Sequence, residues 1–69
     1  MAARNIFMII FSGREWQIIK NGEILKNFIK REDAETAAHV YVDKYLSSEA
    51  YIYRYDGSIQ KTFTNFQKM

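Results

Sequence analysis

Cysteine and proline are absent from this chain of 69 residues, and histidine occurs once. Without cysteine the chain can form neither a disulfide nor a thiolate metal site. A single histidine also argues against a tight structural metal site, so we expect neither a metal nor another cofactor. The lack of cysteine fits a reducing compartment, and a cytoplasmic location is therefore expected. With no proline-rich linker in the sequence, residues 1–69 are expected to form one domain.

Long apolar runs are absent as well. The run from Ile6 to Phe11 is shorter than the apolar region of about 7–15 residues in a signal peptide. It is also far below the length of about 20 residues that spans a bilayer. We therefore expect a buried strand at this position and no association with a membrane.

Neither sign of charge predominates, since 10 basic and 8 acidic residues leave a formal net charge of only +2. No block of lysine and arginine marks a nucleic-acid or membrane surface. A domain of this size buries only about 60% of the surface of its unfolded chain, so its stability is marginal. Because cysteine and metal ligands are lacking, a partner subunit is the remaining means of stabilisation.

The order of hydrophobic patterns predicts the fold. Asn21-Gly22 and Asp56-Gly57 lie between strand candidates, where two-residue turns favour residues that tolerate positive φ. We predict an α+β domain, an antiparallel β-sheet with one helix in the order β-β-β-α-β-β. The predicted strands are Ile6–Phe11, Trp16–Ile19, Ile24–Phe28, Ala50–Tyr55 and Ile59–Thr64, and the helix covers about Arg31–Leu46.

Period-two alternation assigns side chains to the two faces of each predicted strand. Both faces of the first strand are expected to be buried, because it is apolar at every position from Ile6. In the third strand, strict alternation places Ile24, Lys26 and Phe28 on one face. In the last strand, it places Ile59, Lys61 and Phe63 on one face and Gln60 and Thr62 on the other.

The predicted helix has an apolar stripe with polar residues opposite it. Small residues in its first turns would let it approach the sheet closely. Its expected capping residue, Lys30, cannot accept a hydrogen bond from the first backbone N–H groups. The stripe consists of Ala34, Ala37, Ala38, Tyr41, Val42, Tyr45 and Leu46.

A helix about 10 Å wide covers roughly two strands spaced about 4.8 Å apart. A five-stranded sheet would therefore keep one face without any helix. Burying its apolar residues requires a strongly curled sheet or a second subunit, and a two-fold homodimer is the favoured interpretation. The other interpretation is a monomer that exposes a few aromatic side chains.

Candidate reactive groups are few. Glu35, His39 and Asp43 follow one another at helical spacing and could hold a divalent ion, but one helix face supplies too few ligands for tight binding. The favoured interpretation is a solvated helix face with a contact between an acidic side chain and the imidazole one turn away. No phosphate-binding glycine loop and no nucleophile motif is present. We therefore expect a protein that is not an enzyme.

The strand surfaces suggest a different activity, because alternation places Tyr51, Tyr53 and Tyr55 on one face of the fourth strand. A sheet with basic and aromatic residues can bind nucleic acid by base stacking and phosphate contacts. The alternative is that the tyrosines pack under the helix while the basic residues only solubilise the surface. Protein binding through an edge strand or the helix is a third possibility. The possible nucleic-acid contacts are Lys20, Lys26, Tyr51, Tyr53, Arg54, Tyr55 and Lys61.

Three segments carry a resemblance to a family: Trp16–Ile19, Phe28 followed by Ala34 in the helix, and Tyr51–Ile59. With them the chain resembles, over nearly its whole length, the short bacterial proteins of domain of unknown function family 2188. It departs at Lys30, where that family tends to have a capping threonine. The family has no assigned activity, so the resemblance implies a fold and a size only.

The first half is also similar to the small arm-binding domains of phage-type integrases, which run a three-stranded sheet into a helix and read DNA with the sheet. This chain differs by its two strands after the helix. Taken together, we expect a cytoplasmic binding or accessory module that is not an enzyme and forms a homodimer. The alternative is DNA or RNA binding through the sheet, and the identity of any protein partner stays open.

Overall fold

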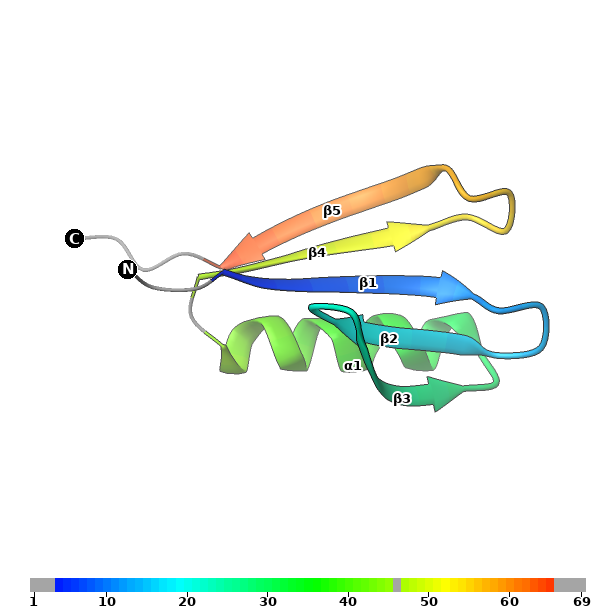
Figure 1. Cartoon of the computed structure of the whole chain (residues 1–69), viewed down its shortest axis with the longest axis horizontal. Coiled ribbons are helices and arrows are strands. Elements are labelled where there is room, and N and C mark those ends of the chain that lie inside the picture. Colours follow the sequence, from blue (N-terminus) through cyan, green and yellow to red (C-terminus); the bar gives the residue numbers. More distant parts are fainter. Residues whose placement is uncertain (1–3, 46, 66–69) are drawn as a thin grey trace.

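The computed structural model describes residues 4–45 and 47–65 as one five-stranded sheet with a single helix along one side (Figure 1). The α+β class and the predicted order of elements are confirmed. All bounds lie within two residues of the predicted ones. The elements are β1 (Asn5–Phe11), β2 (Trp16–Lys20), β3 (Glu23–Phe28), α1 (Arg31–Lys44), β4 (Ser48–Tyr53) and β5 (Ile59–Asn65).

The strands lie side by side in the order β3-β2-β1-β4-β5, so β1 is central. The sheet is mixed, because β1 and β4 are parallel while the other three pairs are antiparallel (Figure 1). This corrects the expectation of an entirely antiparallel sheet. The reason is the crossover: α1 carries the chain back to the end of the sheet where β1 starts, and a crossover of this length joins parallel strands.

Both predicted turn sequences form turns, but only Asn21-Gly22 closes a two-residue hairpin. The turn at Asp56-Gly57 is longer, because the Arg54 backbone N–H donates to the Ser58 carbonyl across it, and Gly57 but not Asp56 has a positive φ. Asn21 and Gly22 have φ values of 50° and 90°, which the Asn-Gly sequence tolerates well. The Asn21 side chain also accepts a hydrogen bond from the Ile6 backbone N–H at 2.8 Å. The β2–β3 hairpin is thereby fixed to the central strand as well as to itself.

The core lies between the sheet and α1. Phe7, Ile9, Ile18 and Ile52 are fully buried under the helix. Burying a side chain of this size stabilises a fold by about 1.5–3 kcal/mol. The helix contributes buried Ala34, Ala38 and Val42, while Ala37, Tyr41 and Tyr45 pack against the core, so the predicted stripe is confirmed for these residues.

The two ends of α1 differ. Lys30 occupies the N-cap and its side chain makes no capping hydrogen bond, as predicted. The helix ends at Lys44, two residues before the predicted end, because Tyr45 is extended; Leu46 lies outside the described residues. The single Ser48 hydroxyl proton is shared between the carbonyl oxygens of Tyr45, at 2.7 Å, and Val42, at 3.1 Å, and Ser48 thereby caps the C-terminal end of α1.

Two β-bulges overturn the strict alternation expected in β3 and β5. Ile24 pairs with Ile19 of β2, while Lys26 pairs with the buried Ile18. Ile24 therefore lies on the side of the sheet away from α1, and Lys26 lies on the covered side. Ile59 pairs with Tyr53, while Lys61 pairs with the buried Ile52. Ile59 therefore also lies on the side of the sheet away from α1. An extra residue in one strand places the side chains before it and after it out of step with strict alternation. Ile24 and Ile59 each stand just before the extra residue, and this is why alternation failed at both positions.

Candidate functional site

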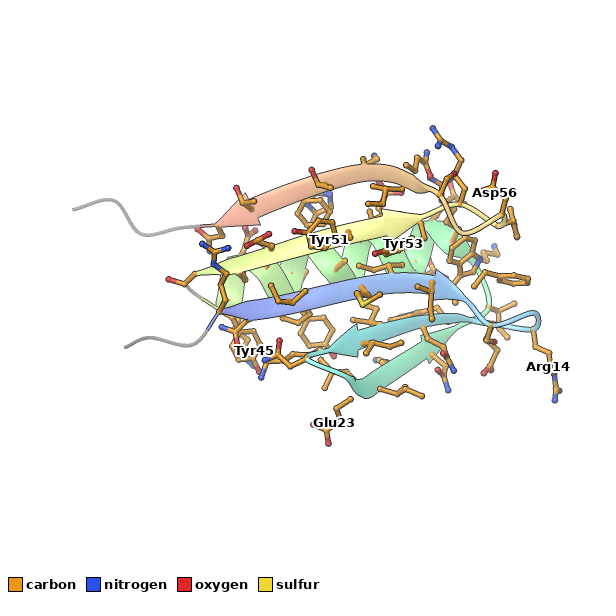
Figure 2. All side chains as sticks on the ribbon, turned by 45° about the horizontal axis from the view of Figure 1, so that its top comes forward. Arg14, Glu23, Tyr45, Tyr51, Tyr53 and Asp56 are labelled. Carbon is orange, nitrogen blue, oxygen red and sulfur yellow. The ribbon has the colours of Figure 1, made fainter. Side chains whose placement is uncertain are left out.

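The most prominent surface is the side of the sheet turned away from α1. Within residues 4–45 and 47–65, no other element covers it, and Figure 2 looks onto it with α1 behind the sheet. The residues on this side alternate with the buried core residues of the same strands. We call it the open face; its apolar and aromatic members are Ile6, Met8, Ile10, Ile19, Ile24, Tyr51, Tyr53 and Ile59.

The centre of the open face is formed by neighbouring strands. Met8 pairs with Ile19 on one side and with Tyr51 on the other. These three side chains are half-buried. Ile24 and Ile59, which the bulges direct to this side, remain 53% and 48% exposed near its edges. The apolar strip thus runs across β3, β2, β1 and β4 through Ile24, Ile19, Met8 and Tyr51. On β5 the residue opposite Tyr51 is the polar Thr62, and Ile59 lies opposite Tyr53 instead.

Charge on the open face is confined to one end of β4. Glu49 forms an ion pair with Arg4 at 2.6 Å and accepts a hydrogen bond from the Tyr51 hydroxyl. The hydrogen bond to the Glu49 carboxylate, helped by desolvation, raises the pKa of Tyr51 above its ordinary value. The Tyr51 phenol is therefore neutral at physiological pH, and its ring is held along the sheet.

The structure divides the residues that were predicted to contact nucleic acid. Tyr51 and Tyr53 lie together on the open face (Figure 2). Lys61 instead pairs with Glu35 of α1 at 2.5 Å. The Lys20 and Lys26 ammonium groups lie over the rings of Tyr45 and Phe28, at 5.1 Å and 5.4 Å from the ring centroids, on the side of the sheet that α1 covers.

Arg54 and Tyr55 follow β4, which ends at Tyr53 rather than at Tyr55 as predicted. Arg54 Nη1 donates to the Ile59 carbonyl at 3.1 Å and thereby closes the β4–β5 turn. The Tyr55 ring lies 4.9 Å from the Phe11 ring and 5.2 Å from the Trp16 ring, although 72% of Tyr55 is exposed. Tyr55 therefore extends the helix-covered side of the sheet rather than the open face.

Two of the helix residues considered as metal ligands, Glu35 and His39, make separate contacts. Glu35 is bound by Lys61, whose hydrogen bond lowers the pKa of the Glu35 carboxyl. The His39 ring stacks on Phe63 at 4.0 Å between centroids. Among the described residues, no group of three or more histidine, aspartate and glutamate side chains is placed to hold a metal ion.

Sequence reasoning missed most of the open face as a site. The one sequence signal for this face was the uninterrupted apolar run of β1, which predicted that both faces of this strand are buried. It did not predict which residues of the neighbouring strands lie beside β1 on the open face. The positions of Ile24 and Ile59 had no such signal, because the bulges that direct them are set by tertiary packing.

None of the helices in the described part of the chain is both long and apolar enough to cross a membrane. No protein-family model, no curated protein and no solved structure matches this chain. The resemblance to family 2188 therefore stays a prediction, and the function has to be argued from the side chains.

Proposed function

We propose that this chain is a small cytoplasmic binding module, not an enzyme, that works as a homodimer joined through the open face. The observation that carries the proposal is the apolar strip centred on Met8, which α1 does not cover. Its side chains are aliphatic, thioether or phenolic, and the Tyr51 hydroxyl already donates to Glu49, so the strip supplies mainly contact area. Exposed apolar patches of this kind mark interaction sites.

The area of the open face fits a second copy of this chain. Five strands spaced about 4.8 Å apart and about 20 Å long span roughly 500 Å². Two such faces bury about 1,000 Å² in total, which is the lower limit for a specific interface. A two-fold axis places each apolar strip against its own copy, and the Glu49 charge is already paired with Arg4.

A charge at the centre of the open face tests the dimer. Met8→Lys is expected to raise the dimer dissociation constant by at least about 100-fold, because the lysine would be desolvated without a partner. Sedimentation equilibrium at micromolar concentration measures this effect. Val40→Lys is the matched control, since Val40 is an apolar residue 62% exposed on α1, away from the open face.

Either of two results would refute the dimer: a wild-type protein that stays monomeric at the highest concentration, or a Met8→Lys variant that still dimerises. Circular dichroism must show the same fold for all three proteins.

Nucleic-acid binding is the second candidate, and one observation favours it. Tyr51 and Tyr53 lie on the side of the sheet away from α1, where bases could stack on them. The separation of Lys20, Lys26 and Lys61 from these rings weighs against it. Anisotropy of labelled single-stranded DNA, duplex DNA and RNA, at low and near-physiological salt, is the appropriate measurement. Salt-sensitive binding that weakens in Tyr53→Ala would support this candidate, and its absence at high micromolar protein would remove it.

A further inference from the structure

A small cavity lies on the other side of the sheet from the open face, where α1 begins. Trp16 of β2, Arg31 of α1, Tyr55 of the β4–β5 turn, and Arg54 and Gln60 line it, and its volume is about 180 Å³. Such a volume is below the roughly 300–1,000 Å³ of pockets for drug-sized ligands. It suits a single ring with one or two small substituents.

The β-bulge in β5 builds one wall of this cavity. Gln60 is the extra residue between the Tyr53–Ile59 and Ile52–Lys61 pairs. The bulge turns Gln60 toward the start of α1, while it sends Ile59 to the open face. The Trp16 and Tyr55 rings, in edge contact at 5.2 Å, form an aromatic wall.

Two of the residues that line the cavity each carry a buried polar atom without a protein partner. Among the described residues, neither Arg31 Nε nor Gln60 Oε1 has a hydrogen-bond partner, and both atoms are buried. Buried polar groups in native proteins are nearly always hydrogen-bonded. One of these atoms needs an acceptor and the other needs a donor, so a group that fits both must carry each kind of atom.

The charge of the lining is positive. Arg31 and Arg54 contribute guanidinium groups, and none of the lining residues is acidic. Arg54 uses Nη1 to hold Ser58 and Ile59 in the turn, which fixes its position at the cavity. A guanidinium group matches the planar geometry of a carboxylate.

We propose that the cavity formed by Trp16, Arg31, Arg54, Tyr55 and Gln60 binds a small aromatic carboxylate that also carries a hydroxyl or N–H donor. Because both polar atoms are buried, the Arg31 and Gln60 side chains turn toward the ligand on binding. The carboxylate then accepts from Arg31 Nε, the donor reaches Gln60 Oε1, and the ring lies against Trp16 and Tyr55. This site is independent of the dimer, because it lies on the opposite side of the sheet.

Titration of the ¹⁵N-labelled protein with meta- and para-hydroxybenzoate, followed by NMR, tests the site. The Trp16 indole N–H and the Arg31 Nε–H signals are expected to shift in a saturable way, with an apparent dissociation constant of about 1 mM for at least one isomer. Benzoate lacks the donor and is expected to bind at least about threefold more weakly. Acetate lacks the ring, and benzyl alcohol lacks the charge; neither is expected to saturate.

Variants assign the effect to the cavity. Arg31→Gln is expected to weaken binding at least about tenfold, and Arg31→Lys, which keeps the charge but loses the planar fork, is expected to weaken it by an intermediate factor. Lys44→Gln is the matched control, because it removes the same charge from the last turn of α1 and should leave the constant unchanged.

Three results would overturn the proposal: no saturable shift at tens of millimolar ligand, equal shifts with acetate, or unchanged binding in a folded Arg31→Gln variant. The amide spectrum of each variant reports whether it is folded.

Discussion

The two sides of this sheet are built by the same strands and yet differ in how they are completed. On one side, Ile9 and Ile52 are fully buried, because Ala34 and Ala38 let α1 approach closely. On the other side, Ile10 and its neighbours are only half-buried, and no described element covers them. Adjacent residues of one strand thus meet different environments.

The difference teaches that hydrophobicity alone does not separate core from interface. The covered side is closed within the chain, so its residues determine the stability of the monomer. The open face gains cover only from a second molecule, so its residues should determine association. Substitutions of like residues on opposite sides separate these two roles.

The largest expected effect comes from Ile9→Ala, compared with Ile10→Ala. Removing the buried Ile9 side chain should lower the free energy of unfolding by about 2–5 kcal/mol, through lost burial and the cavity that remains. Ile10→Ala should cost about 1 kcal/mol or less in the monomer, because Ile10 is already partly exposed.

Urea denaturation of both variants at several protein concentrations measures the difference. The effect of Ile9→Ala should be independent of concentration, while that of Ile10→Ala should grow as the protein becomes dimeric. Equal losses of stability at high dilution would contradict the division of roles.

A smaller effect is expected at the bulge residues. Ile24→Lys and Ile59→Lys should change the free energy of unfolding by no more than about 0.5 kcal/mol, because both side chains are about half exposed. Each should weaken the dimer by about tenfold, since a lysine replaces apolar contact near the edge of the open face.

Sedimentation equilibrium measures the dimer, and Val40→Lys is the control, because Val40 is 62% exposed on α1, away from the open face. A dimer that weakens equally in all three variants would show that the bulges do not set the edge of the interface.

The sequence predicted the elements of the fold well, because its signals are local. Asn21-Gly22 and Asp56-Gly57 are turn sequences, and the spacing of Ala34, Ala38 and Val42 identifies the buried side of a helix. The direction of β4 was not predicted, because parallel pairing with β1 depends on where the crossover returns the chain.

The candidate site was predicted less well, because face assignment is not local. Alternation groups Tyr51, Tyr53 and Tyr55 on one face, which is right for Tyr51 and Tyr53 and wrong for Tyr55, because β4 ends at Tyr53. Alternation also cannot say which face α1 covers. One bulge in each outer hairpin then reverses Ile24 and Ile59. Lys61 was grouped with the strand surface, and no sequence signal indicated its ion pair with Glu35 on α1.

The smallest expected effect concerns this ion pair at the edge of the covered side. Because Lys61 lowers the pKa of Glu35 in the folded chain, the pair stabilises the fold fully above the unfolded carboxyl pKa of about 4.3. This contribution is lost as the pH falls through the lower, folded pKa. Both side chains are partly exposed, so it amounts to about 0–1 kcal/mol.

Lys61→Gln should therefore lower the free energy of unfolding slightly at pH near 7 and hardly at all at pH near 3, as urea denaturation would measure. Glu35→Gln in the same background should add little further loss, because its partner is already gone. Dimerisation should be unchanged in both variants, since Lys61 and Glu35 lie on the other side of the sheet from Met8. A loss that is larger at low pH would show that the carboxyl is not stabilised by Lys61, and a weakened dimer would show that the two sides of the sheet are coupled.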